Sequence, residues 1–154
     1  MKVEIDKMFE ISDTIVLGNG IDINRFKELK KSNFEVRKEL GIPQNAYVVG
    51  HVGRFMYIKN QKFLIDVYME ILKIKPNAWL MMIGDGNDET KIRAMLENNN
   101  VSNTTVILSH RSDIPELLNS MDGFIYPSLF EGFSLAMAEA QIAGVRCVCS
   151  DTIP

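Results

Sequence analysis

The sequence predicts an α/β domain built on a doubly wound parallel sheet. Short, nearly continuous apolar runs recur along the chain from Ala46, amphipathic segments alternate with them, and clusters of Gly, Pro and Asn separate the two. Apolar strands separated by helices are typical of a parallel sheet whose two faces are both covered. The chain has 154 residues, of which 46% are hydrophobic, and this suits one domain with a proper core.

The first two strands and their helices are predicted from spacing. The β-branched run 47–52 ends at Gly53 and predicts the first strand, and residues 79–83 predict the second. Between them a helix is predicted over 61–75, because apolar residues recur there at helical intervals: Phe63, Leu64, Val67, Ile71 and Leu72. A further helix is predicted over 88–97, with an inner face of Ile92, Met95 and Leu96.

Three more strands follow the same alternation, at residues 106–108, 123–126 and 147–149. The helix before the fourth strand should start at Asp113, because Asp113 and Glu116 have the spacing of a capping box and Pro115 suits a first turn. The helix before the fifth strand should follow Ser134 and stop at Gly144. The pattern therefore predicts a Rossmann-like domain over residues 46–154.

The first forty-five residues are less regular, and we expect residues 1–45 to form a hinge segment that leads into the domain. Residues 14–17 are strand-like, residues 18–22 form a turn, and residues 32–40 predict a helix that closes at Gly41. The mixture of charged and apolar residues in 1–13 does not fit a signal peptide.

Composition excludes some classes of partner. The net charge of −3, the pI near 5.4 and the lack of a Lys/Arg cluster exclude a nucleic-acid partner. No apolar run approaches the roughly 18 residues that a membrane span needs, so we expect a soluble, cytoplasmic chain. Cys147 and Cys149 should share one face of a strand as buried free thiols, and the isolated His51 and His110 do not complete a metal site.

The ligand crevice is expected beyond the carboxyl ends of the strands, where the strand order reverses. If the order is the common one, the loops after the first and fourth strands flank that point. The first loop carries Arg54 and Lys59 just after Gly53. Such cations can offset the charge that develops on a departing diphosphate.

The second loop is part of the most informative segment of the chain, residues 127–140. It places Glu131 and Glu139 at E-x7-E spacing, with a turn and a helix start between them. Unpaired amides at a helix start can bind anionic oxygens, and the candidates are Gly132, Phe133, Ser134 and Leu135. Alternatively, Ser128 and Glu131 form a capping box and Glu139 is an ordinary solvated residue.

Taken together, the motifs resemble the carboxyl-terminal, donor-binding half of a retaining glycosyltransferase with the GT-B fold, of family 4 (group 1). The resemblance runs over nearly the whole chain and is closest to capsular and exopolysaccharide biosynthesis enzymes. The segments that carry it are Asn19–Asp22, Gly53–Asn60, Gly84–Gly86, Asp113–Leu118 and Glu131–Glu139.

The resemblance implies a role for each candidate residue. Arg54 and Lys59, with Gly53 beside them, would bind the donor diphosphate, and Glu131 would contact the donor sugar. Glu139 would bind the ribose, while the amides of residues 132–135 would serve the sugar and phosphate. Arg111 lies in the loop where the family often lodges the base. Arg54, Lys59 and Glu131 are thus the catalytic candidates, with no metal or other cofactor expected.

The same resemblance implies an activity. The parent enzyme would transfer a sugar from a UDP-, GDP- or ADP-sugar to a glycan or lipid-linked acceptor, with retention and in polysaccharide biosynthesis. The acceptor-binding, amino-terminal half is missing, so we expect a truncated donor domain that is inactive alone, and peripheral membrane association of the parent. Val145 and Arg146 depart from the pattern after Gly144. An isolated nucleotide-sugar-binding module and a GT-B-type sugar-nucleotide epimerase stay open as alternatives.

Overall fold

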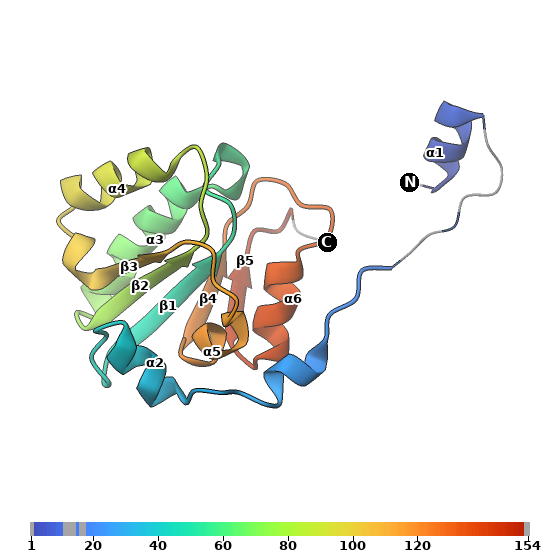
Figure 1. Ribbon diagram of the computed structural model, residues 1–154. Helices are drawn as coiled ribbons and strands as arrows, with labels where there is room; N and C mark the ends of the chain where they lie inside the picture. The colour runs from blue at the N-terminus through green and yellow to red at the C-terminus, as the bar shows by residue number, and fades with distance from the viewer. Residues whose placement is uncertain (1, 11–14, 16–17, 153–154) are drawn as a thin grey trace.

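Five parallel strands form the centre of the structure, a computed structural model that describes residues 2–10, 15 and 18–152 (Figure 1). In spatial order the sheet reads β3-β2-β1-β4-β5. The strands are β1 (Tyr47–Val52), β2 (Ala78–Ile83), β3 (Thr105–Leu108), β4 (Gly123–Tyr126) and β5 (Arg146–Cys149). The chain proceeds outward from β1 to β3 and then returns to the other side of β1, so the strand order reverses between β1 and β4. This confirms the predicted doubly wound topology.

Helices cover both faces of the sheet (Figure 1). On one face lie α3 (Gln61–Ile74) and α4 (Glu89–Asn98), and on the other lie α2 (Asn33–Glu39), α5 (Ile114–Asn119) and α6 (Leu135–Ile142). Short 3-10 turns occur at η1 (Ile23–Phe26), η2 (Tyr57–Lys59) and η3 (Ser102–Thr104). Neighbouring strand residues point to opposite faces, so Val48 packs with Leu117 and Val49 packs with Leu64 in separate cores.

The predicted strands and helices from residue 32 onward are confirmed to within a few residues. Ser32 caps α2 in a complete capping box with Glu35. Before that point the agreement is poorer. The helix α1 (Lys2–Phe9) was not predicted, and the strand-like stretch 14–17 lies, except for Ile15, outside the described residues.

The predicted capping box at the start of α5 is wrong. Asp113 is the N-cap residue but makes no side-chain cap bond, because its carboxylate accepts hydrogen bonds from Arg111 instead. Glu116 instead contacts the segment that precedes α2. Its Oε1 accepts a hydrogen bond from the backbone N–H of Lys30 at 3.1 Å. Pro115 does lie in the first turn, as predicted.

The expectation of buried thiols is also wrong, although both cysteines are free. Cys147 is half-buried and Cys149 is exposed, because β5 is the edge strand of the sheet. Phe63 of α3 is also exposed, although its helical spacing with other apolar residues predicted that it faces the core. Phe63 and Cys149 instead line a small apolar groove between α3 and β5.

Arg37 joins α2 to the sheet and is almost fully buried. All five of its N–H groups donate hydrogen bonds, to the carbonyls of Gln44, Ala46 and Ser120 and to the carboxylate of Asp122. Asp122 also accepts from the backbone N–H of Val48 at 2.8 Å. This one side chain therefore holds α2 against the starts of β1 and β4.

We expect Arg37→Met to lower the free energy of unfolding by about 3 kcal/mol, because it leaves buried carbonyls and a carboxylate without their donor. Urea unfolding measures the difference. Lys38→Met, on the exposed side of the same helix, is the matched control and should change stability little. Equal stability of the two variants would contradict the assignment.

Candidate functional site

The loops that follow β1 and β4 meet at the point where the strand order reverses. The backbone N–H of Leu129 donates to the carbonyl of Ile58 at 2.8 Å. Beside this bond, the ammonium of Lys59 contacts the carboxylate of Glu131 in a close ion pair. The structure thus brings together the two segments that the sequence placed on either side of a crevice.

The loop after β1 is supported by the loop after β2. The N–H of Phe55 donates to the carbonyl of Asp85 at 2.7 Å, and the N–H of Asp88 donates to the carbonyl of Phe55 at 3.1 Å. A side chain at Gly84 would place its Cβ 2.1 Å from the carbonyl oxygen of Gly53. Only glycine permits this approach, so Gly84 is required for the shape of the loop that carries Arg54 and Lys59.

Lys59, Glu131 and Tyr126 form one hydrogen-bonded trio. Lys59 Nζ donates to the hydroxyl of Tyr126 at 2.8 Å, and that hydroxyl donates to Oε1 of Glu131 at 3.0 Å. Burial lowers the pKa of Lys59, but the bonds to Glu131 and Tyr126 outweigh it and the pKa lies above 10.5. Burial likewise raises the pKa of Glu131, but Lys59 and Tyr126 bring it below 4.5. Both groups are therefore charged at neutral pH.

Tyr126 is held in place by the rings around it. Its ring stacks with that of His51 at 5.6 Å and with that of Phe124 at 5.9 Å between centroids. His51 is fully buried and its Nδ1 lies 3.0 Å from the carbonyl of Ile125, so Nδ1 carries the proton. Burial lowers the pKa of His51 to about 4. The imidazole is a neutral structural support behind Tyr126.

Arg54 and the turn before α6 present unengaged donors. Arg54 is exposed, and its guanidinium makes no hydrogen bond or ion pair with any described residue. The backbone N–H groups of residues 132–135 are likewise without a partner within the described ranges. The hydroxyl of Ser134 is already used, because it caps α6 by accepting from the N–H of Met137 at 3.2 Å.

Glu139 is half-buried on α6, and no described residue donates a hydrogen bond to its carboxylate. Burial raises the pKa of Glu139, and the positive charge of Arg25 opposes that rise. The two carboxylates of the E-x7-E pair therefore differ: Glu131 is paired with a cation, whereas Glu139 is an acceptor without a donor.

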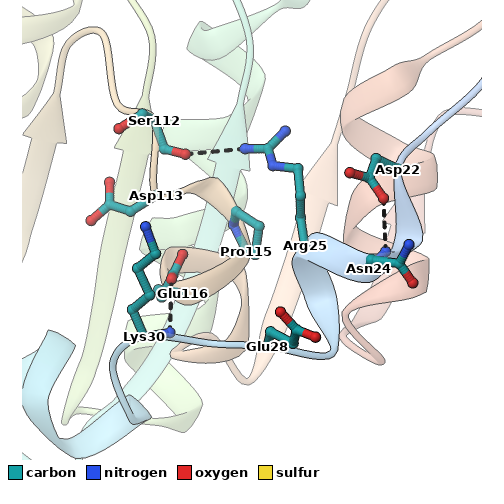
Figure 2. Close-up of a pocket in the computed structure, with 9 residues that line it drawn as sticks. All are labelled: Asp22, Asn24, Arg25, Glu28, Lys30, Ser112, Asp113, Pro115 and Glu116. Carbon is teal, nitrogen blue, oxygen red and sulfur yellow. Dashed lines mark hydrogen bonds between the residues drawn. The ribbon is translucent and has the colours of Figure 1, made fainter.

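Arg25 also lines an open pocket of about 350 Å³ between η1 and α5. Figure 2 shows its side chain reaching across this pocket, where the guanidinium donates to the carbonyl of Ser112 at 3.1 Å. On the η1 side Asp22 accepts from the N–H of Asn24 and so caps η1.

Arg111 lies in the loop after β3 and takes no part in the Lys59–Glu131 contact. Its guanidinium donates two hydrogen bonds to Asp113 and one to Glu39 of α2. These bonds hold the pKa of Asp113 below its usual value. Arg111 lines a second open pocket of about 360 Å³, next to Ser112.

The capping-box alternative for Ser128 and Glu131 is wrong. The helix starts four residues farther on, at Leu135, and is capped by Ser134. Ser128 is buried and its hydroxyl bonds to no described residue. Glu131 is engaged by Lys59 and Tyr126 instead.

Sequence reasoning missed Tyr126 and Arg25 as parts of the site. Tyr126 was placed in the fourth strand only for its apolar ring. Its position as the last strand residue before Pro127 was the available signal, because such residues face the carboxyl edge of the sheet. Arg25 lies in an irregular segment, and no spacing rule predicts that it approaches Glu139.

The described part of the chain contains no group of three or more His, Cys, Asp or Glu side chains able to hold a metal ion. Nor does it contain a helix that is long and apolar enough to cross a membrane.

Known proteins resemble this chain in both sequence and fold. A family model described as glycosyl transferases group 1 matches residues 32–154. The UDP-Gal:alpha-D-GlcNAc-diphosphoundecaprenol alpha-1,3-galactosyltransferase of Escherichia coli is 30% identical over 139 residues, covering 88% of this chain and 36% of that protein. EpsF of Bacillus subtilis, named as a glycosyltransferase, is 31% identical over 138 residues, covering 90% of this chain and 36% of EpsF.

Among solved structures, Anabaena HepE in complex with UDP-glucose superposes with a TM-score of 0.78 and 28% identity, covering 88% of this chain and 38% of HepE. The chain therefore spans little more than a third of the length of these relatives.

Because His51 is buried and neutral, we predict that the protein loses stability as the pH falls. The unfolded chain binds a proton near pH 6.5, whereas the folded chain does so only near pH 4, where the pKa of His51 lies. The free energy of unfolding should therefore fall as the pH drops from about 6.5 to about 4, by up to about 3 kcal/mol from this group.

Urea unfolding at a series of pH values measures this slope. His51→Asn keeps a donor for the carbonyl of Ile125 and should flatten the slope between these pH values. If the free energy of unfolding of His51→Asn fell with pH as steeply as that of the wild type, another group would be the cause.

Proposed function

Because the chain belongs to the group 1 glycosyl transferases, we propose that it is the donor-binding domain of an enzyme that transfers a sugar from a nucleoside diphosphate sugar. One observation carries the proposal. Lys59 from the loop after β1 and Glu131 from the loop after β4 meet at the reversal of strand order, where doubly wound sheets bind ligands. HepE, a relative of the same fold, is solved in complex with UDP-glucose.

The diphosphate of the donor would lie between Arg54, Lys59 and the start of α6. Arg54 has an unengaged guanidinium, and Lys59 uses only two of its three N–H groups. The free amides of residues 132–135 add donors and the positive end of a helix. Gly53 would bring its backbone to the same diphosphate, and its lack of a side chain leaves room for Lys59, whose Cδ would lie 3.8 Å from a Cβ at this position.

The sugar and the ribose would occupy the two ends of this diphosphate. Glu131, fixed by Lys59 and Tyr126, would accept a hydrogen bond from a hydroxyl of the donor sugar. Glu139, whose carboxylate has no donor in the described chain, would accept from the ribose hydroxyls. Arg111 and its neighbour Ser112 would border the base, because they line the two open pockets beside the loop after β3.

In the transfer step, the bond between the anomeric carbon and the diphosphate oxygen breaks while the oxygen of an acceptor hydroxyl bonds to that carbon, and the proton of that hydroxyl is released to the departing diphosphate or to water. The leaving diphosphate keeps the electron pair, and Arg54 and Lys59 would stabilise the added charge. We propose that these cations make a metal unnecessary, and that the transferred sugar, a hexose, retains its anomeric configuration. Glu131 would orient the sugar in this step.

The acceptor would be a glycan or a lipid-linked sugar, reached from the cytoplasm in polysaccharide biosynthesis. The E. coli relative is named for an acceptor on diphosphoundecaprenol, which supports this class. Because the chain spans little more than a third of such relatives, we propose that it binds the donor and that transfer requires a second domain to position the acceptor. On its own it would act as a binding module.

Calorimetric titration with UDP, GDP and ADP tests the donor site. One of them should bind, and Arg54→Ala and Glu139→Ala should each weaken it by about tenfold, the lower end expected for a charge-assisted bond. Arg93→Ala, an exposed arginine on α4, is the matched control and should bind as the wild type does. Failure of all three nucleotides, or equal affinity in the Arg54 and Arg93 variants, would refute the assignment.

Titration of the best nucleotide in excess EDTA and in Mg²⁺ tests the proposed independence from metal. Fixed cations at Arg54 and Lys59 should give affinities that agree within about twofold, because the difference between them is worth well under 1.4 kcal/mol. A tenfold loss of affinity in EDTA would instead mean that a metal bridges the diphosphate.

A further inference from the structure

The role proposed above for Tyr126 is to hold Glu131, yet its hydroxyl contacts two of the candidate catalytic groups, Lys59 and Glu131. It lies at the end of β4, is almost fully buried, and its hydroxyl bonds to both Lys59 and Glu131. A tyrosine hydroxyl has one proton to donate and can also accept. Here the proton goes to Oε1 of Glu131, and the lone pair accepts from Lys59.

The hydrogen-bonding capacity of the trio is only partly used. The ammonium of Lys59 has three N–H groups, of which one goes to Tyr126 and one to Glu131. The bonds from Lys59 and Tyr126 to Glu131 both end on Oε1, whereas the nearby Ser128 hydroxyl helps to lower the pKa of Glu131 but makes no hydrogen bond to Oε2 within the described residues. One donor on Lys59 and one acceptor oxygen on Glu131 therefore stay available on two neighbouring side chains.

The rotation of both side chains is restricted by the Tyr126 ring, which is buried and stacked against two other rings. Tyr126 is packed against the rings of His51 and Phe124, and the fully buried His51 bonds to the backbone of Ile125. Lys59 and Glu131 come from separate loops with flexible side chains. Without the Tyr126 hydroxyl, Lys59 and Glu131 would be joined only by their ion pair, and each side chain could rotate about that single contact.

We propose that Tyr126 is a positioning residue of the donor site, whose hydroxyl fixes Lys59 and Glu131 so that the free N–H meets the diphosphate and the free oxygen meets the sugar. This inference rests on the proposed donor-binding function. It assigns to Tyr126 the orientation of two groups that would otherwise act independently. Pre-organisation of this kind increases affinity by lowering the ordering cost of binding.

A series of ligands tests the inference with Tyr126→Phe. The nucleotide that binds best in the titration above is compared as its monophosphate, its diphosphate and its diphosphate-glucose. In the wild type the affinity should rise along the series. In Tyr126→Phe the gain from the second phosphate and the sugar should shrink by about three- to tenfold, the range for one hydrogen bond, while monophosphate affinity stays within about twofold.

Tyr68→Phe is the matched control. Tyr68 is also fully buried and its hydroxyl bonds to the carbonyls of Ala78 and Thr104, but it lies on α3 in the core. Loss of the Tyr68 hydroxyl should lower the free energy of unfolding and leave the affinities for all three ligands unchanged. An equal weakening of all three ligands in Tyr126→Phe would show a merely structural role and overturn the inference.

The remaining outcomes separate the inference from the proposed function. If the wild-type chain binds no nucleotide, both fail. If it binds and the series is the same in Tyr126→Phe, only the inference fails. A second readout is the carbon-13 NMR titration of the Glu131 carboxyl: its pKa should be higher in Tyr126→Phe than in the wild type, and an unchanged pKa would likewise overturn the inference.

Discussion

The ion pair between Lys59 and Glu131 is the contact on which the site depends. It joins two loops that are 72 positions apart in sequence, and it can form only because β4 returns to lie beside β1. Burying both charges costs desolvation energy that their attraction need not repay, so the pair is a weak source of stability. Its physical effect is on geometry, because it holds two flexible side chains together at the carboxyl edge of the sheet.

Backbone contacts make this arrangement possible. The first loop is pinned on one side by the bond from Leu129 to Ile58 and on the other by the close approach of Gly84 to Gly53. Both contacts are made by backbone atoms at the carboxyl ends of the strands. Arg37 links α2 to the amino-terminal ends of β1 and β4, so it supports the sheet at the end opposite to these loops.

The sequence predicted the parts of the fold that depend on local periodicity, such as β4 at residues 123–126 and the helix α6 after Ser134. It also placed Lys59 and Glu131 at one crevice, because the topology of alternating strands and helices is restricted. It failed where a distant partner competes for a side chain. Asp113 has the spacing of a cap but bonds to Arg111, and Cys149 is apolar in pattern but lies on an edge strand. Tyr126 and Arg25 act through contacts that no spacing encodes.

The two carboxylates of the E-x7-E segment show how one short motif can supply two different acceptors. Glu131 is desolvated but paired, so its pKa falls and it remains an anion that is fixed in direction. Glu139 is desolvated and unpaired, so its pKa rises and its carboxylate lacks a donor. A half-buried carboxylate without a donor gains from hydroxyl donors such as those of a ribose, because hydrogen bonds to a charged acceptor are stronger than those between neutral groups. The paired carboxylate can meet a sugar without attracting a competing cation. In the proposed donor site, these different environments would assign the sugar to Glu131 and the ribose to Glu139.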